Sequence, residues 1–162
     1  MLNQQSFTGN MCIGKTGLAA GTTTTLTSAN AITYSINNVA YAKAITSNEA
    51  TPTTDIVTGA AFVAIPVGSG AVFTIGRDPS GVLKVAQSKI VVLDSDEDFP
   101  AAPPQLARLP NSYTTIGYVS VKVGTSGAAW TFGASNLAGP PTDVDIDYQD
   151  VVFARSTPWA PT

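Results

Sequence analysis

The sequence predicts an all-β protein, an antiparallel β-sandwich or barrel of about eight to nine short strands with extended N- and C-terminal arms. Short apolar or β-branched runs alternate with turn residues along the chain. No window shows the 3.6-residue apolar period of an amphipathic helix. The 162 residues correspond to one domain. We therefore expect an N-terminal arm at residues 1–12, a β domain at residues 13–153 and a C-terminal tail at residues 154–162.

The first strands are predicted from residue type and alternation. A Thr-rich run at residues 21–27 favours an extended strand, because β-branched residues suit a pleated sheet. Apolar and polar residues then alternate over residues 32–36 and again over 39–45. Asn37 and Asn38 lie between these runs and tolerate positive φ, so they predict a two-residue hairpin turn. The segment that follows, up to residue 60, is expected to be a loop.

Turn residues divide the remainder of the chain. Asp78-Pro79-Ser80-Gly81 predicts a tight turn, and Gly124-Thr125-Ser126-Gly127 has the length of a hairpin turn. Residues 94–111 contain four prolines and four acidic residues, too many breakers for a regular element. Between these segments we expect strands at residues 62–65, 71–75, 82–85, 90–93, 115–123, 128–132 and 144–153. In the 115–123 strand, Val119, Val121 and Val123 are expected to share one face.

Composition excludes several classes of function. Charged residues make up 12% of the chain, about half the usual share of about 25%. The net charge of −3 and the absence of a basic stripe argue against nucleic-acid binding. The chain has no histidine, and Cys12 is its single cysteine, which excludes histidine-based catalytic triads and Cys-rich zinc sites. No apolar stretch is long enough to span a membrane as a helix. The first twenty residues lack the pattern of a signal peptide, so we expect synthesis in a cytoplasm.

The segment from Gly9 to Thr16 matches the Walker A pattern at every specified position, and residues 90–94 resemble a Walker B strand. A phosphate-binding loop requires a buried strand before it and a helix after it. Polar residues precede Gly9, and glycines with β-branched residues follow Thr16. We therefore interpret the match as accidental and expect no nucleotide, no cofactor and no catalytic residue.

Two acidic clusters each begin with Asp-x-Asp-x-Asp, at Asp94 and at Asp143. The resemblance to a calcium loop ends there, because Phe99 and Tyr148 occupy the position that requires glycine. Along a strand, Asp143, Asp145 and Asp147 would share a solvent-facing side. That solvated face is the favoured interpretation, with adventitious calcium or a salt-bridged subunit contact as alternatives, and we assign no metal site.

Aromatic residues suggest both a core and possible anchors for a partner. Trp130, Phe132 and Tyr118 occur at strand-like positions and are expected in the core or an interface. Trp159 lies near the end of a polar tail, where it either packs on its own domain or anchors a partner. Phe7 and Trp159 are the candidate partner anchors.

Three segments carry a resemblance to a known group of proteins: Thr16 to Thr25, the hairpin at residues 32–44, and Ala129 to Asn136. The chain resembles small structural proteins of tailed bacteriophages, and within that group the capsid decoration (cement) proteins. The resemblance implies a β-rich subunit on the capsid surface of the virion. It also implies that the major capsid protein is the partner and that the subunit forms a homo-oligomer, with a trimer favoured over a dimer.

Other interpretations stay open at this stage. A tail, baseplate or head-fibre component is a second structural possibility, and a carbohydrate- or receptor-binding β-sandwich module belongs to a different class. We expect the arms to contact neighbouring subunits, because they contain few apolar side chains to offset the entropy lost when they become ordered.

Overall fold

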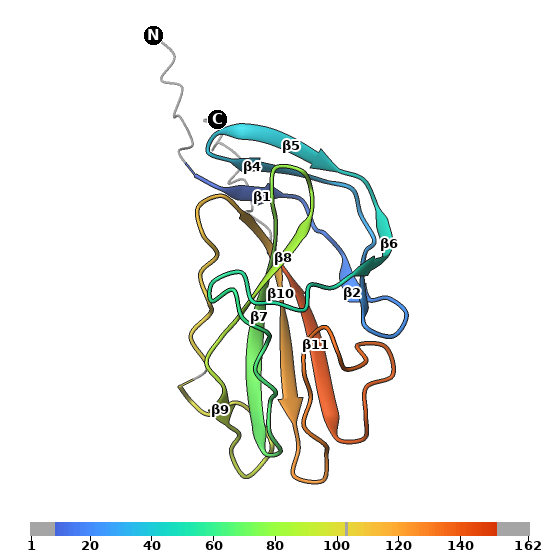
Figure 1. Ribbon diagram of the computed structural model, residues 1–162, viewed down its shortest axis with the longest axis vertical. Helices are drawn as coiled ribbons and strands as arrows, with labels where there is room; N and C mark the ends of the chain where they lie inside the picture. Colours follow the sequence, from blue (N-terminus) through green and yellow to red (C-terminus); the bar gives the residue numbers. More distant parts are fainter. Residues whose placement is uncertain (1–8, 103, 152–162) are drawn as a thin grey trace, which may run out of the picture.

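A computed structural model describes residues 9–102 and 104–151 of the chain. The described part is all-β, with eleven strands in three antiparallel sheets and no helix, which confirms the predicted fold class. One sheet lies across the end of the longest strands, as Figure 1 shows. The strands are β1 (Met11–Ile13), β2 (Leu18–Ala20), β3 (Thr25–Ser28), β4 (Ile32–Ile36), β5 (Val39–Lys43), β6 (Thr46–Ala50), β7 (Ser69–Arg77), β8 (Leu83–Gln87), β9 (Val91–Val92), β10 (Thr114–Val123) and β11 (Val144–Asp150).

The predicted hairpin forms the three-stranded sheet β1-β4-β5. Asn37 and Asn38 both have positive φ, 50° and 67°, as a type I′ turn requires. The inward side of β4 carries buried Ile32, Tyr34 and Ile36. Met11 and Cys12 lie in β1, which pairs with β4, so the expected boundary between residues 12 and 13 lies inside a strand.

The largest sheet has the order β11-β10-β7-β8, and β9 also pairs with β7. β10 alternates as expected, since Val119, Val121 and Val123 are fully buried while the residues between them are partly exposed. β7 is buried along nearly its whole length. One of its sides faces the core, and a loop covers the other, where the Thr74 hydroxyl donates to the Ala107 carbonyl at 2.7 Å.

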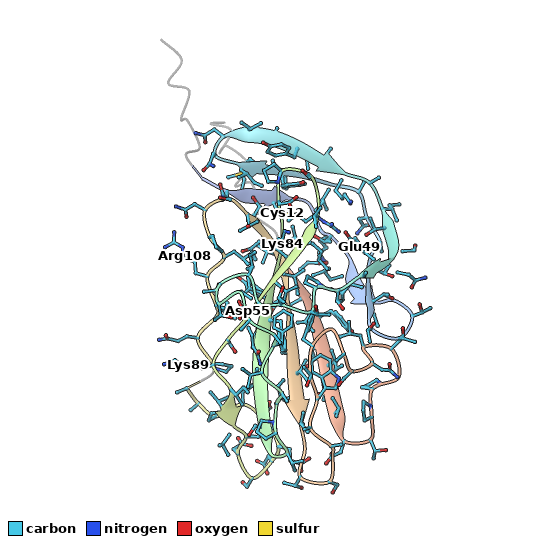
Figure 2. All side chains as sticks on the ribbon, in the orientation of Figure 1. Cys12, Glu49, Asp55, Lys84, Lys89 and Arg108 are labelled. Carbon is cyan, nitrogen blue, oxygen red and sulfur yellow. The ribbon has the colours of Figure 1, made fainter. Side chains whose placement is uncertain are left out.

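The third sheet, β2-β3-β6, corrects the expectation of a loop after residue 45. β6 pairs with β3, although its sequence, Thr-Ser-Asn-Glu-Ala, lacks the alternation of a strand. Glu49, labelled in Figure 2, accounts for its position. Its carboxylate binds Arg77 on β7. The predicted strand at residues 21–27 begins later, at Thr25.

Two predicted strands, residues 62–65 and 128–132, are wrong: the two segments form a single isolated bridge, between Ile65 and Trp130. Ile65 and Trp130 exchange two backbone hydrogen bonds, of 2.8 and 3.0 Å. Pro66 has no N–H with which to extend this ladder. The turn at 124–127 therefore closes no hairpin, and β10 pairs instead with β11. Asp143, expected to share a strand face with Asp145 and Asp147, precedes β11 and has a φ of 64°.

Aromatic side chains form the centre of the core. Phe62, Phe73, Trp130 and Phe132 contact one another with ring centroids 4.6 to 6.0 Å apart. Trp130 is fully buried, and its indole N–H donates to the Asn136 carbonyl at 3.2 Å. Phe73 comes from β7, and the other three come from two loops. The core therefore packs these loops against the sheet, although the sheet's hydrogen bonds do not include them.

A buried ion pair connects the third sheet to the largest one. Arg77 is fully buried, and its Nη2 lies 2.6 Å from Glu49 Oε2. The same guanidinium donates to the Gly81 carbonyl and to the Ser28 hydroxyl. Its Nε has no hydrogen-bond partner among the described residues. Burial would raise the pKa of Glu49, but the hydrogen bond and the charge of Arg77 hold it below its ordinary value.

Tyr148 on β11 has a buried hydroxyl with no hydrogen-bond partner in the described part of the chain. Burial raises the pKa of this phenol to about 12. We expect Tyr148→Phe to raise the free energy of unfolding by about 1 kcal/mol, because it removes an unsatisfied buried polar group. Urea unfolding at neutral pH measures the change.

The matched control for that prediction is Tyr34→Phe. The Tyr34 hydroxyl donates to the Asp78 carbonyl at 2.9 Å, so its removal is expected to lower stability by about 1 kcal/mol. Equal decreases in the free energy of unfolding of Tyr148→Phe and Tyr34→Phe would contradict the prediction.

Candidate functional site

The two predicted anchors, Phe7 and Trp159, lie outside the described residues. The described residues include three candidate features: the segment with the Walker pattern, the acidic clusters, and an uncharged sheet face with a neighbouring cleft.

The segment that matches the Walker pattern has a different geometry from a phosphate-binding loop. Its centre is strand β1, and strand β2 follows it where a nucleotide-binding helix would begin. Thr16 is fully buried, and its hydroxyl donates to the Ile116 carbonyl at 3.2 Å instead of facing a ligand. Cys12 lies beneath the sheet in the core, and burial raises the pKa of its thiol. These residues therefore hold the domain together.

The acidic clusters are engaged by the protein itself. The Asp94 carboxylate accepts hydrogen bonds from the backbone N–H groups of Asp96 and Asp98, each at 3.0 Å. Lys122 Nζ lies 3.0 Å from Asp145 and 3.4 Å from Asp98, and the hydrogen bond with Asp145 raises the pKa of the lysine. The described residues contain no group of three metal-ligating side chains.

The solvent-facing side of β11 is as predicted for Asp145 and Asp147, which are exposed, while Val144 is buried. Asp143 is used elsewhere, because its carboxylate accepts from the Ser126 N–H at 2.7 Å. This part of the surface thus combines acidic groups with one lysine.

The outer face of the sheet β1-β4-β5 is uncharged. Residues paired across neighbouring strands point to the same side, and the exposed side of this sheet presents only neutral side chains. Ile13, with 54% of its surface exposed, is the largest exposed apolar group on it. We call this face the platform; its residues are Met11, Ile13, Thr33, Ser35, Ala40 and Ala42.

A cleft of about 700 Å³ lies beside the platform, between the turn of the β4–β5 hairpin, β10 and the loop that carries Leu106 to Tyr113. Asn10 connects two walls of the cleft. The side-chain amide of Asn10 donates to the carbonyls of Asn111 and Tyr113, and its side-chain oxygen accepts from the Asn37 N–H. A second hollow of about 520 Å³ shares Leu106 and Tyr118 with it.

The chemistry of the cleft is that of a polar binding surface. Its lining includes Asn37, Asn38, Tyr113 and Tyr118, and Arg108 is the charged side chain among its described residues. Figure 2 shows Arg108 pointing away from the strands into solvent. Burial raises the pKa of the Tyr118 phenol, which favours its protonated form. No pair of carboxylates faces this cleft among the residues that line it.

Sequence reasoning missed the platform because it assigned Met11 and Cys12 to an arm. The predicted hairpin at residues 32–44 supplies two of the three strands of the platform. The third strand carries no signal of its own, since three residues are too few to show alternation.

No helix in the described part of the chain is long and apolar enough to cross a membrane. Compared with models of protein families, with curated proteins and with solved structures, this chain matches none of them.

Proposed function

We propose that this chain is a structural virion protein that binds the outside of an assembled bacteriophage capsid and stabilises the contacts between capsomers. The observation that carries the proposal is the platform, a sheet face without charge at one end of the domain. The sequence resemblance to capsid decoration proteins supplies the kind of partner, the major capsid protein.

The composition of the platform suits contact with protein. Charged residues are depleted at the centres of protein interfaces, because burying an unpaired charge costs free energy. The acidic groups around Asp94, Asp98 and Asp145 lie near the opposite end of the largest sheet, where Asp98 and Asp145 contact Lys122. The platform side chains are short apart from Met11 and Ile13, so another subunit can approach the backbone closely.

We expect Ile13→Glu to reduce occupancy on capsids that lack the protein by more than tenfold, because it places a charge inside the proposed contact. A tenfold loss corresponds to about 1.4 kcal/mol of binding free energy. Co-sedimentation with capsids measures occupancy, and thermal unfolding of the free variant checks that the domain is intact.

The matched control is Val92→Glu, which introduces the same charge at another strand residue with 75% exposure, on β9. It is expected to bind capsids as the original chain does. Equal losses in both variants, or full occupancy of Ile13→Glu, would show that the platform is not the contact.

The arms are a separate part of the proposal, with Phe7 and Trp159 as anchors. Deleting residues 1–8 or 154–162 is expected to lower capsid occupancy strongly. The melting temperature of the free subunit is expected to change little. The deletion stops at residue 8 because β1 begins at Met11. Full occupancy after both deletions would assign the binding to the domain alone.

The cleft favours a second candidate function, a carbohydrate- or receptor-binding module. Asparagine amides and tyrosine rings are typical of surfaces that bind neutral sugars, and both line this cleft. A glycan array with the free protein tests it: a saturable signal that Tyr118→Ala abolishes would favour this function. A map of the whole particle separates a capsid location from a tail, baseplate or head-fibre location.

A further inference from the structure

Strand β5 forms an edge of its sheet, because it pairs with β4 alone. The type I′ turn makes Ile36 and Val39 a hydrogen-bonded pair. Since such pairs alternate along an antiparallel ladder, the backbone N–H and C=O groups of Ala40 and Ala42 face away from β4. No described residue forms a hydrogen bond with these backbone groups, and both alanines are exposed.

The other edges of the described sheets are protected. At β8, the Val85 carbonyl accepts from the Ile56 N–H, and the Gln87 N–H donates to the Asp55 carboxylate. At β2, the Asp150 carboxylate accepts from the Leu18 N–H. On β6, Asn48 interrupts the strand with a φ of 55°. Strand β11 carries exposed acidic side chains, and β1 and β9 are only three and two residues long.

Strand β5 has none of these protective features over residues 39–42. It contains no proline, no bulge and no charge before Lys43, and its register with β4 is unbroken. Tyr41 is held in place by stacking on Tyr34, with ring centroids 5.6 Å apart. A regular, uncharged and exposed edge of this kind is a template for another strand.

We propose that this edge pairs with the β5 edge of a second copy of this chain, in antiparallel orientation with Tyr41 opposite Tyr41 of the second copy. Ala40 and Ala42 then form hydrogen-bonded pairs with Ala42 and Ala40 of the second copy, so all their outward backbone groups find partners. The two lysines at position 43 lie opposite Val39 of the other copy. They are four residues apart along the strands, about 13 Å, beyond the screening length of about 8 Å at physiological salt.

This pairing joins two three-stranded sheets into one of six strands and doubles the area of the platform. A two-fold contact gives a dimer, in contrast to the trimer that the sequence resemblance favours. One edge strand buries little area, so the free dimer is expected to dissociate readily, and the pairing strengthens where a common surface holds two copies close together.

Disulfide trapping tests the pairing in the full chain. Residues at a non-hydrogen-bonded position lie about 4.5 Å apart between Cα atoms, within the range that a disulfide spans. Tyr41→Cys is therefore expected to give a covalent dimer under mild oxidation. Thr33→Cys is the matched control: it is exposed on β4, which the two β5 strands separate from its copy by about 14 Å.

A second pair of variants retains Tyr41 and covers the case in which its replacement disturbs folding. Ala40→Lys/Ala42→Lys places lysines directly opposite one another across the contact, and is expected to raise the dimer dissociation constant at least tenfold in sedimentation experiments. Thr33→Lys/Ser35→Lys adds the same charge on β4 and is expected to leave it unchanged. Three outcomes would overturn the proposal. They are equal cross-linking of the two cysteine variants, no cross-link in folded Tyr41→Cys, and a dimer dissociation constant that Ala40→Lys/Ala42→Lys leaves unchanged.

Discussion

Trp130→Ala is expected to lower the free energy of unfolding by about 3–5 kcal/mol, the largest loss from a single substitution in this domain. The indole is fully buried and contacts Phe73 and Phe132. Removing it leaves a cavity and also leaves the Asn136 carbonyl without its donor. Such a loss is a large fraction of the total stability of about 5–15 kcal/mol that a domain possesses.

Chemical unfolding followed by circular dichroism measures that loss, and Val92→Ala is the control at an exposed position. The control is expected to change stability by less than about 0.5 kcal/mol. A loss below 1 kcal/mol for Trp130→Ala would mean that the aromatic cluster does not form the centre of the core.

Glu49→Gln is expected to destabilise the domain by about 3 kcal/mol, because it leaves the buried Arg77 guanidinium without a counter-charge. This value lies at the low end for a buried pair, since the Glu49 side chain keeps 20% of its exposure. The double variant Arg77→Met/Glu49→Leu is expected to recover most of the loss. It removes both charges and also the unpartnered Nε.

Acid unfolding tests the same ion pair. The folded pKa of Glu49 is below its ordinary value of 4.5, so the folded state favours the ionised form. The resulting stability is fully present above the unfolded pKa and is lost as pH falls through the folded pKa. The gap in stability between the original chain and Glu49→Gln is therefore constant at neutral pH and narrows below about pH 4. A gap that stays constant in acid would contradict the assignment.

Local sequence determined those elements whose signals lie within a few residues. Asn37 and Asn38 predicted the β4–β5 hairpin because a two-residue turn needs two positive φ angles. The turn at residues 78–81 formed as expected, with the Asp78 carboxylate accepting from the Ser80 and Val82 N–H groups. The alternation in β10 likewise identified its buried side.

Contacts between distant residues decided the rest. Strand β6 has no strand pattern, and it is held by pairing with β3 and by Arg77, 28 residues away. Residues 62–65 have the pattern, but the side-chain amide of Gln87 takes the place of a strand by bonding the N–H and C=O of Val63. The platform itself exists because Met11 and Ile13 pair with a strand some twenty residues later. The fold class and the β4–β5 hairpin thus follow from local sequence, whereas long-range packing selects which neutral residues share the platform, because no local period records a strand's pairing partner.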